Sequence, residues 1–276
     1  MPTRAPLCGL IEPGRKDAKF IMIINCSYVE AAFKDYTDHY DSADPKVRLK
    51  IDHTRRVAVL ADRIEQSEGR TSGIGWLTGM LHDIGRFEQL RRFHTFVDSR
   101  SIDHAELGAD ILFRDGLIRR FTEDNSKDGL LEKAIRLHNK LNLPEKLESE
   151  EQFYCNVIRD ADKIDILKVI CETPFNDIYD CTPLELAQSP ISDAAFQQIM
   201  EHKTIDRKIS QTYMDVYLNK ISFVFGLVFS ESLRLIREQG YLQQLLDFHS
   251  VNADTESKLQ MIRSDVKDYL SQSRHP

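Results

Sequence analysis

The chain has 276 residues, of which 41% are hydrophobic, so it can bury the core of one large domain or of a domain with an extension. Its formal net charge of −7 argues against binding along an extended nucleic acid and favours a small ligand. The five cysteines are odd in number and form no C-x-x-C pair, which predicts reduced thiols and a cytoplasmic protein. The apolar run at residues 20–24 is too short to span a membrane, so we expect no membrane partner.

The sequence predicts an all-α protein in three parts. Residues 1–20 contain three prolines and no periodic pattern, which predicts a poorly ordered leader. Residues 21–172 read as helices separated by short polar loops and form the predicted core. Residues 173–276 are expected to form a C-terminal helical extension packed on that core, with a structural role or a role in homodimer formation. Within it, residues 221–229 could form a strand by composition, but a surrounding period of about 3.6 residues favours a buried helix.

The first helix with a candidate site residue spans residues 48–65, after a start signal at Asp44-Pro45. His53 shares one face of this helix with Val57 and Leu60, so its imidazole points into the core. Taken alone, a histidine in this position is more often a hydrogen-bonded core residue than a metal ligand.

The second helix ends at His82-Asp83-Ile84-Gly85, where an imidazole and a carboxylate are adjacent. Neighbouring helical residues project about 100° apart, so the imidazole can bind one metal ion while the carboxylate reaches toward a second. Gly85 suits the left-handed turn that ends many helices.

Two further histidines lie on apolar helix faces. His104 is in register with Leu107 and Ile111, and His138 follows Ile135 at the end of a fourth helix. The alternative for His138 is a histidine that stabilises the helix dipole.

Three acids, Asp160, Asp162 and Asp165, lie within a strongly apolar helix near residues 157–170. A buried carboxylate needs a positive partner because burying it unpaired costs several kcal/mol. That partner is either a metal ion or one of the basic side chains of the same segment: Arg159, Lys163 or Lys168. Together with the four histidines, these acids favour a transition-metal site, for which Fe, Mn, Co, Ni and Zn are all chemically possible.

The order of these residues resembles the HD superfamily of phosphohydrolases, whose pattern is H … HD … H … H … D. The most specific segments are H-D-I-G-R at 82–86, H-A-E-L-G-A-D-I-L at 104–112 and A-D-K-I-D at 161–165. The last segment selects Asp162 as the ligand and leaves Asp160 as a candidate that supports the ligands from behind.

The resemblance implies an HD-domain helical bundle that holds two divalent transition-metal ions. One ion would be held by His53, His82, Asp83 and Asp162. Asp83 would bridge to a second ion held by the other two histidines of the pattern, His104 and His138. A hydroxide bridging both ions would then attack phosphorus, which gives Asp83 a catalytic role.

Departures from the family's pattern narrow the range of possible substrates. The cyclic dinucleotide phosphodiesterases of this superfamily show H-D-I-G-K, a second adjacent histidine and a G-Y-P segment, whereas this chain has Arg86, Asn139 and no G-Y-P. These differences disfavour a cyclic dinucleotide.

The candidates for phosphate binding and for proton donation follow the HD pair closely in the sequence, except for Lys163. Arg86 is the first candidate to bind a phosphate, with His94 and Lys163 as further candidates. Glu88 is a candidate proton donor to the leaving group, and His94 is the alternative. Arg91 and Arg92 could also bind an anionic substrate, but they are equally well explained as solvated charges on a surface loop.

We therefore predict a metal-dependent phosphohydrolase that acts on a small phosphorylated substrate, either a nucleotide or another phosphoester. Two other functions fit the same residues. The di-iron oxygenases of the HD superfamily use the same six ligands, and a metal-stabilised helical module could sense a nucleotide or bind a partner without catalysis.

Overall fold

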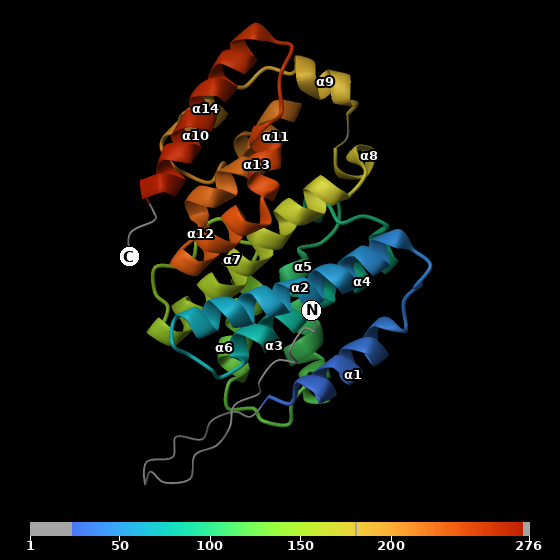
Figure 1. Ribbon diagram of the computed structural model, residues 1–276. Coiled ribbons are helices and arrows are strands. Elements are labelled where there is room, and N and C mark those ends of the chain that lie inside the picture. The colour runs from blue at the N-terminus through green and yellow to red at the C-terminus, as the bar shows by residue number, and fades with distance from the viewer. Residues whose placement is uncertain (1–23, 180, 273–276) are drawn as a thin grey trace, which may run out of the picture. The chain divides into compact units, whose positions relative to one another are not determined.

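The computed structural model describes residues 24–179 and 181–272, and none of these residues forms a β-strand (Figure 1). The predicted all-α class is therefore confirmed. The expected leader at residues 1–20 lies outside the described residues. The chain divides into two compact units between Ala161 and Asp162, whereas the sequence suggested a boundary after residue 172. The division falls inside helix α7 (Ser149–Glu172).

The first unit consists of helices connected by short loops. In chain order these are α1 (Cys26–Thr37), α2 (Pro45–Ser67), α3 (Ile74–Leu81), α4 (Ile84–Phe93), α5 (His104–Ala109), α6 (Asp128–Leu137) and the first half of α7. Short 3-10 turns occur at Asp98–Arg100 and Leu117–Arg120, and α5 continues into a π-helical turn at Asp110–Arg114.

Helices α2 and α3 pack closely against each other in the first unit. The predicted start of α2 is confirmed, because the Asp44 side chain accepts a hydrogen bond from the Lys46 amide at 2.7 Å and Pro45 is the first helical residue. Gly79 allows the close packing, since a Cβ atom there would lie 2.8 Å from the Ala58 nitrogen. The apolar faces meet in one core, whose fully buried members include Phe33, Leu77, Met80, Leu81, Ile84, Leu112, Leu131 and Ile135.

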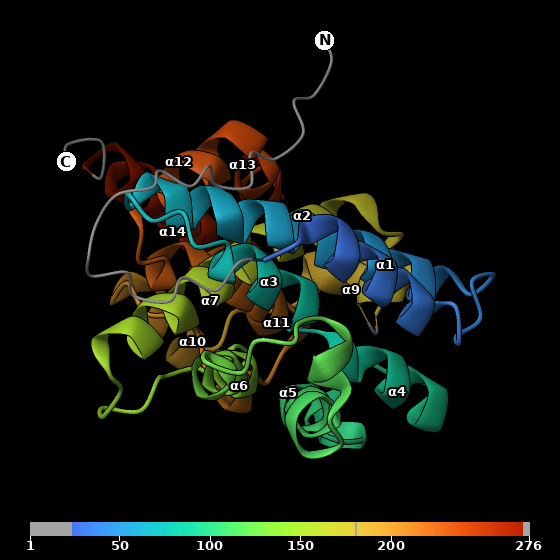
Figure 2. The ribbon, with the colours of Figure 1, turned by 90° about the horizontal axis from the view of Figure 1, so that it is seen from below.

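Gly85 has a different role from the one predicted. Its φ is not positive and it belongs to α4, which only two residues separate from the end of α3. A Cβ atom at Gly85 would lie 2.6 Å from the Gly108 nitrogen and closer still to the His104 carbonyl oxygen. Gly85 therefore permits the close approach of α4 and α5, which lie side by side in Figure 2.

The second unit continues from α7 through shorter helices. These are α8 (Phe175–Ile178), α9 (Pro183–Gln188), α10 (Asp193–Met200), α11 (Tyr213–Ile221), α12 (Ser230–Gln239), α13 (Tyr241–Leu246) and α14 (Ala253–Gln272), with a 3-10 turn at Arg207–Ile209.

The buried helix expected at residues 221–229 is wrong in part. Helix α11 ends at Ile221, and a 3-10 turn follows at Ser222–Gly226. The Ser222 hydroxyl donates to the Asn219 carbonyl at 2.7 Å and accepts from the Ile205 amide at 3.0 Å, which fixes this tighter turn. Most apolar side chains of the segment are buried without continuing the α-helix, whereas Val228 is exposed. In the part of the chain that the structure describes, no helix is long and apolar enough to cross a membrane.

We predict that Gly85→Ala destabilises the first unit by about 2 kcal/mol or more, because the new methyl group overlaps the backbone of α5. Gly129→Ala is the matched control, since a Cβ atom at Gly129 meets nothing within 4 Å in helix α6. The control should leave stability unchanged or raise it by up to about 1 kcal/mol. Urea unfolding followed by circular dichroism measures both changes, and equal midpoints for the two variants would contradict this role of Gly85.

Candidate metal centre

Asp83 lies at the centre of a cluster of buried histidines. Its Oδ2 atom is 3.5 Å from His53 Nε2 and 3.5 Å from His82 Nε2. Its Oδ1 atom is 3.4 Å from His104 Nε2 and 3.8 Å from His138 Nε2. The structure thus brings five predicted site residues together and divides the four imidazoles into two pairs, one for each carboxylate oxygen.

Four helices deliver these side chains. His53 projects from the buried face of α2, and His82 and Asp83 form the tight connection between α3 and α4. His104 is the first residue of α5, and His138 directly follows α6. Because three of the four imidazoles lie at helix ends, small shifts of these helices would move the imidazoles apart.

Hydrogen bonds to backbone carbonyl groups fix two of the imidazole rings. His82 Nδ1 lies 2.7 Å from the Gly79 oxygen, and His138 Nδ1 lies 2.7 Å from the Ile135 oxygen. A carbonyl oxygen only accepts, so both rings carry their hydrogen on Nδ1. Each ring therefore directs Nε2 toward Asp83.

A carboxylate fixes the third ring. His104 Nδ1 lies 2.7 Å from Asp98 Oδ2. Burial opposes ionisation of Asp98, but the hydrogen bond from His104 and the charge of Arg86 outweigh burial and hold the pKa of Asp98 well below its usual value. The ionised carboxylate accepts, so His104 also carries its hydrogen on Nδ1.

A cation would stabilise the contact between His104 and His138. Burial, reinforced by the charge of Arg86, lowers the pKa of His104 to about 4, so this ring is neutral at pH 7. Its Nε2 atom lies 3.0 Å from His138 Nε2. With both Nδ1 atoms protonated, two neutral rings would direct lone pairs at each other. An added proton or a metal ion removes this repulsion, and the nitrogen and oxygen donor set fits a divalent transition metal.

Two basic side chains flank Asp83. Lys50 Nζ donates to Oδ2 at 2.7 Å, and Arg86 Nε lies 3.6 Å from Oδ1. Burial alone would raise the pKa of Asp83, but the charges of Lys50, His82 and Arg86 outweigh it and hold the pKa well below its usual value. The carboxylate is therefore ionised.

Sequence reasoning missed Lys50. The available signal was its position three residues before His53, which places both side chains on one side of α2. The Lys50 side chain is 14% exposed, so its ammonium group is within reach of solvent.

Arg86, the first candidate to bind a phosphate, has protein partners at Nη1. Its Nη1 atom donates to the Phe96 carbonyl at 2.6 Å, to Asp98 Oδ1 at 2.8 Å and to Gln89 Oε1 at 2.8 Å. These contacts engage Nη1 with the loop that follows α4, and the phosphate-binding role of Arg86 stays a prediction.

Glu88 does not suit the predicted role of proton donor. The carboxylate pairs with Arg91 and Arg92, and Tyr40 donates to it at 3.4 Å. Burial would raise the pKa of Glu88, but the hydrogen bonds from the two arginines outweigh it and lower that pKa. An ionised carboxylate has no proton to donate. His94, the other candidate, is exposed at the end of α4 with a left-handed backbone (φ 56°).

The remaining predicted residues lie along α7. Asp160 is completely buried in the first unit, whereas Asp162 and Lys163 begin the second unit. Lys163 Nζ donates to the Gly226 carbonyl at 3.1 Å. The roles assigned to these three residues stay predictions.

A second basic residue that the sequence did not single out, Lys220, lies in the second unit. Burial, with the charge of Arg207, lowers the pKa of Lys220 to about 7, and the charge of Asp162 opposes this shift. The electrostatic interaction places Lys220 among the neighbours of Asp162.

Comparison with known proteins agrees with this geometry. Residues 51–167 match the family model described as HD domain, and this range contains all six residues predicted as ligands. Searches among curated proteins and among solved structures found no match. HD domains bind divalent metal ions and belong to a superfamily of metal-dependent hydrolases. Residues 51–167 of this chain are therefore similar to the HD domain family.

Proposed function

We propose that the protein is a metal-dependent phosphohydrolase that acts on a small phosphorylated substrate, either a nucleotide or another phosphoester. The observation that carries this proposal is the division of the Asp83 oxygens between two histidine pairs. A carboxylate shared in this way supports two adjacent metal positions, which suits the in-line displacement of a phosphate ester.

The residues for each position follow from the same distances. His53, His82 and Asp83 Oδ2 would hold one ion, with Asp162 added by the resemblance. His104, His138 and Asp83 Oδ1 would hold the second ion. When bound, such ions supply Lewis acidity and lower the pKa of a coordinated water molecule.

The side chains of the site prepare it for an anionic substrate. The hydrogen-bonded Nδ1 atoms hold the His82, His104 and His138 rings with Nε2 toward the centre. Lys50 carries a positive charge on the same carboxylate and remains partly exposed. We assign to Lys50 the phosphate-binding role that the sequence suggested for Arg86, because the Arg86 contacts are used by the loop.

The proposal predicts that the purified protein binds up to two ions per chain and releases phosphate or nitrophenol from a panel of nucleotides and nitrophenyl phosphates with Mn, Co or Fe added. His82→Ala and Asp83→Ala should lose metal and reduce hydrolysis by at least about 100-fold, since both remove direct ligands. His39→Ala is the control, because His39 is an exposed histidine on the turn after α1.

Two results would overturn this function. Unchanged metal content and hydrolysis in both ligand variants would exclude a catalytic metal site at Asp83. Oxygen uptake by the iron-loaded protein without phosphate release would assign the chain to the oxygenase class instead.

A second prediction concerns Lys50. Lys50→Met should retain both ions and raise KM for a hydrolysed phosphoester about 10-fold, which corresponds to one lost charge contact of about 1.4 kcal/mol. Lys50→Arg should recover part of the loss because it restores the charge. Lys46→Met, an exposed position on the same helix, is the control. An unchanged KM together with reduced metal content would mean that Lys50 only balances the charge of Asp83.

A further inference from the structure

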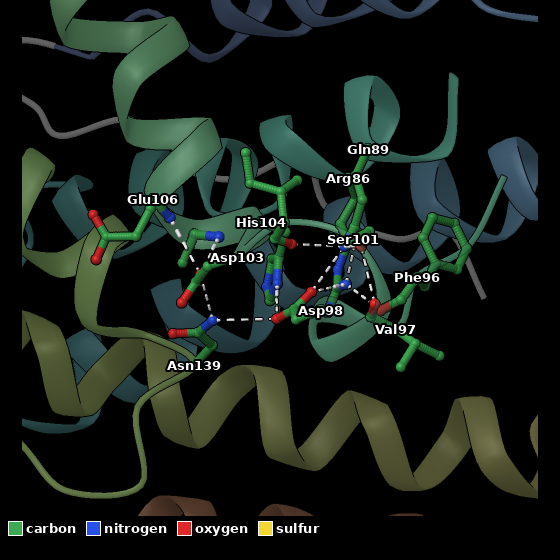
Figure 3. A network of polar contacts seen from close by, with 12 residues as sticks. Arg86, Gln89, Phe96, Val97, Asp98, Ser101, Asp103, His104, Glu106 and Asn139 are labelled. Atoms are coloured by element: carbon green, nitrogen blue, oxygen red, sulfur yellow. Dashed lines mark hydrogen bonds and ion pairs between the residues drawn. The ribbon is translucent and has the colours of Figure 1, made fainter. Parts of the chain in front are cut away.

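A network of hydrogen bonds lies behind His104 and converges on Asp98 (Figure 3). Asp98 stands in the loop between α4 and α5, in the 3-10 turn Asp98–Arg100. Its Oδ2 atom faces His104 Nδ1 at 2.7 Å. Its Oδ1 atom accepts from Arg86 Nη1 at 2.8 Å and from Gln89 Nε2 at 2.9 Å. With both oxygens engaged from opposite sides, the orientation of the carboxylate is fixed.

Helix α4 holds the loop on both sides of Asp98. Gln89, which is completely buried, also donates to Ser101 Oγ at 2.9 Å and to the Ile102 carbonyl at 2.9 Å. Arg86 donates to the Phe96 carbonyl on the other side of Asp98. Because α4 begins directly after Asp83, these contacts place the loop relative to the shared carboxylate.

The same network extends to Asn139, the neighbour of His138 in the sequence. Asn139, the residue after His138, donates to Asp103 Oδ1 at 2.8 Å and lies 3.5 Å from Asp98 Oδ2. Asp103 in turn caps α5 through the Ala105 amide at 3.0 Å. Asp98 is thus linked to the pair on Asp83 Oδ1, whereas the His82 ring of the other pair is fixed by a carbonyl of its own helix.

Asp98, Asp103 and His104 are close enough to hold an ion among themselves, but their hydrogen bonds explain the arrangement. His104 Nδ1 carries a hydrogen, the Asp98 oxygens accept from four side chains, and Asp103 pairs with Lys140 at 2.6 Å while it caps α5. Asp98 therefore supports the His104 ring, Asp103 caps its helix, and the group does not form a separate metal site.

We infer that Asp98 is a positioning residue for His104 and makes the second metal position dependent on the loop between α4 and α5, while the first position does not depend on it. This inference rests on the proposed two-metal site. A carboxylate behind a metal-binding imidazole fixes its tautomer and orientation and increases its basicity, and loss of such a partner typically weakens metal binding about 10- to 100-fold. The Asp98 side chain is 29% exposed. Arg86 and Gln89 hold its loop through their hydrogen bonds.

The test is Asp98→Asn in the full chain, with metal content, Mn²⁺ titration and electron paramagnetic resonance as readouts. The wild-type protein should bind two Mn²⁺ ions that show spin coupling. The variant should keep the first ion with unchanged affinity, bind the second about 10- to 100-fold more weakly and lose the spin-coupled signal. Asp115→Asn, an exposed acid in the first unit, should behave as the wild type.

Several results separate this inference from the proposed function. A wild-type protein that binds a single ion contradicts the two-metal site itself. Two tightly bound ions in Asp98→Asn, or equal weakening of both ions in a folded variant, overturn the role of Asp98. If Asp98→Asn does not fold, Gln89→Leu removes the loop contacts while Asp98 and its Arg86 pair are retained. That variant should weaken the second ion alone, and unchanged binding of both ions would overturn the inference.

Discussion

The first unit depends on one buried carboxylate with an imidazole pair at each of its oxygens. An ionised Asp83 in the interior is costly unless cations surround it, since a buried charge without partners loses several kcal/mol of solvation. Lys50 and Arg86 supply part of that compensation, one at each oxygen. Metal ions would supply the rest, because Nε2 of the neutral His104 ring faces Nε2 of His138 beside the same carboxylate.

Close helix packing makes this arrangement possible. The connection between α3 and α4 is only two residues long, and both of them are site residues. Gly79 lets α3 approach α2, and Gly85 lets α4 approach α5, so the four imidazoles meet within one cluster. Glycine at these two positions therefore serves the site through packing rather than through unusual backbone angles.

Periodicity predicted much of this site from the sequence and failed where contacts come from loops. Histidines on apolar helix faces point inward wherever the helices pack, so the grouping of His53, His104 and His138 could be predicted. Asp98 sits in a loop, where no period indicates the direction of a side chain. The partners of Arg86, Phe96 and Asp98, come from that loop. Because such contacts cannot be predicted from periodicity, the sequence suggested that Arg86 binds a ligand. For α7, periodicity alone could not separate Asp160 from Asp162.

The imidazole rings of the cluster differ in the groups that hold them. His82 and His138 use carbonyl groups one helical turn earlier, which persist as long as their helices do. His104 uses a side chain on a partly exposed loop, and loops open locally at lower free energy than packed helices. On the proposed two-metal site, order in the α4–α5 loop and occupancy of the second metal position would be linked, so each would stabilise the other by the same free energy. A substrate that bridges both positions would gain from the same link, because it stabilises the ordered loop as it binds.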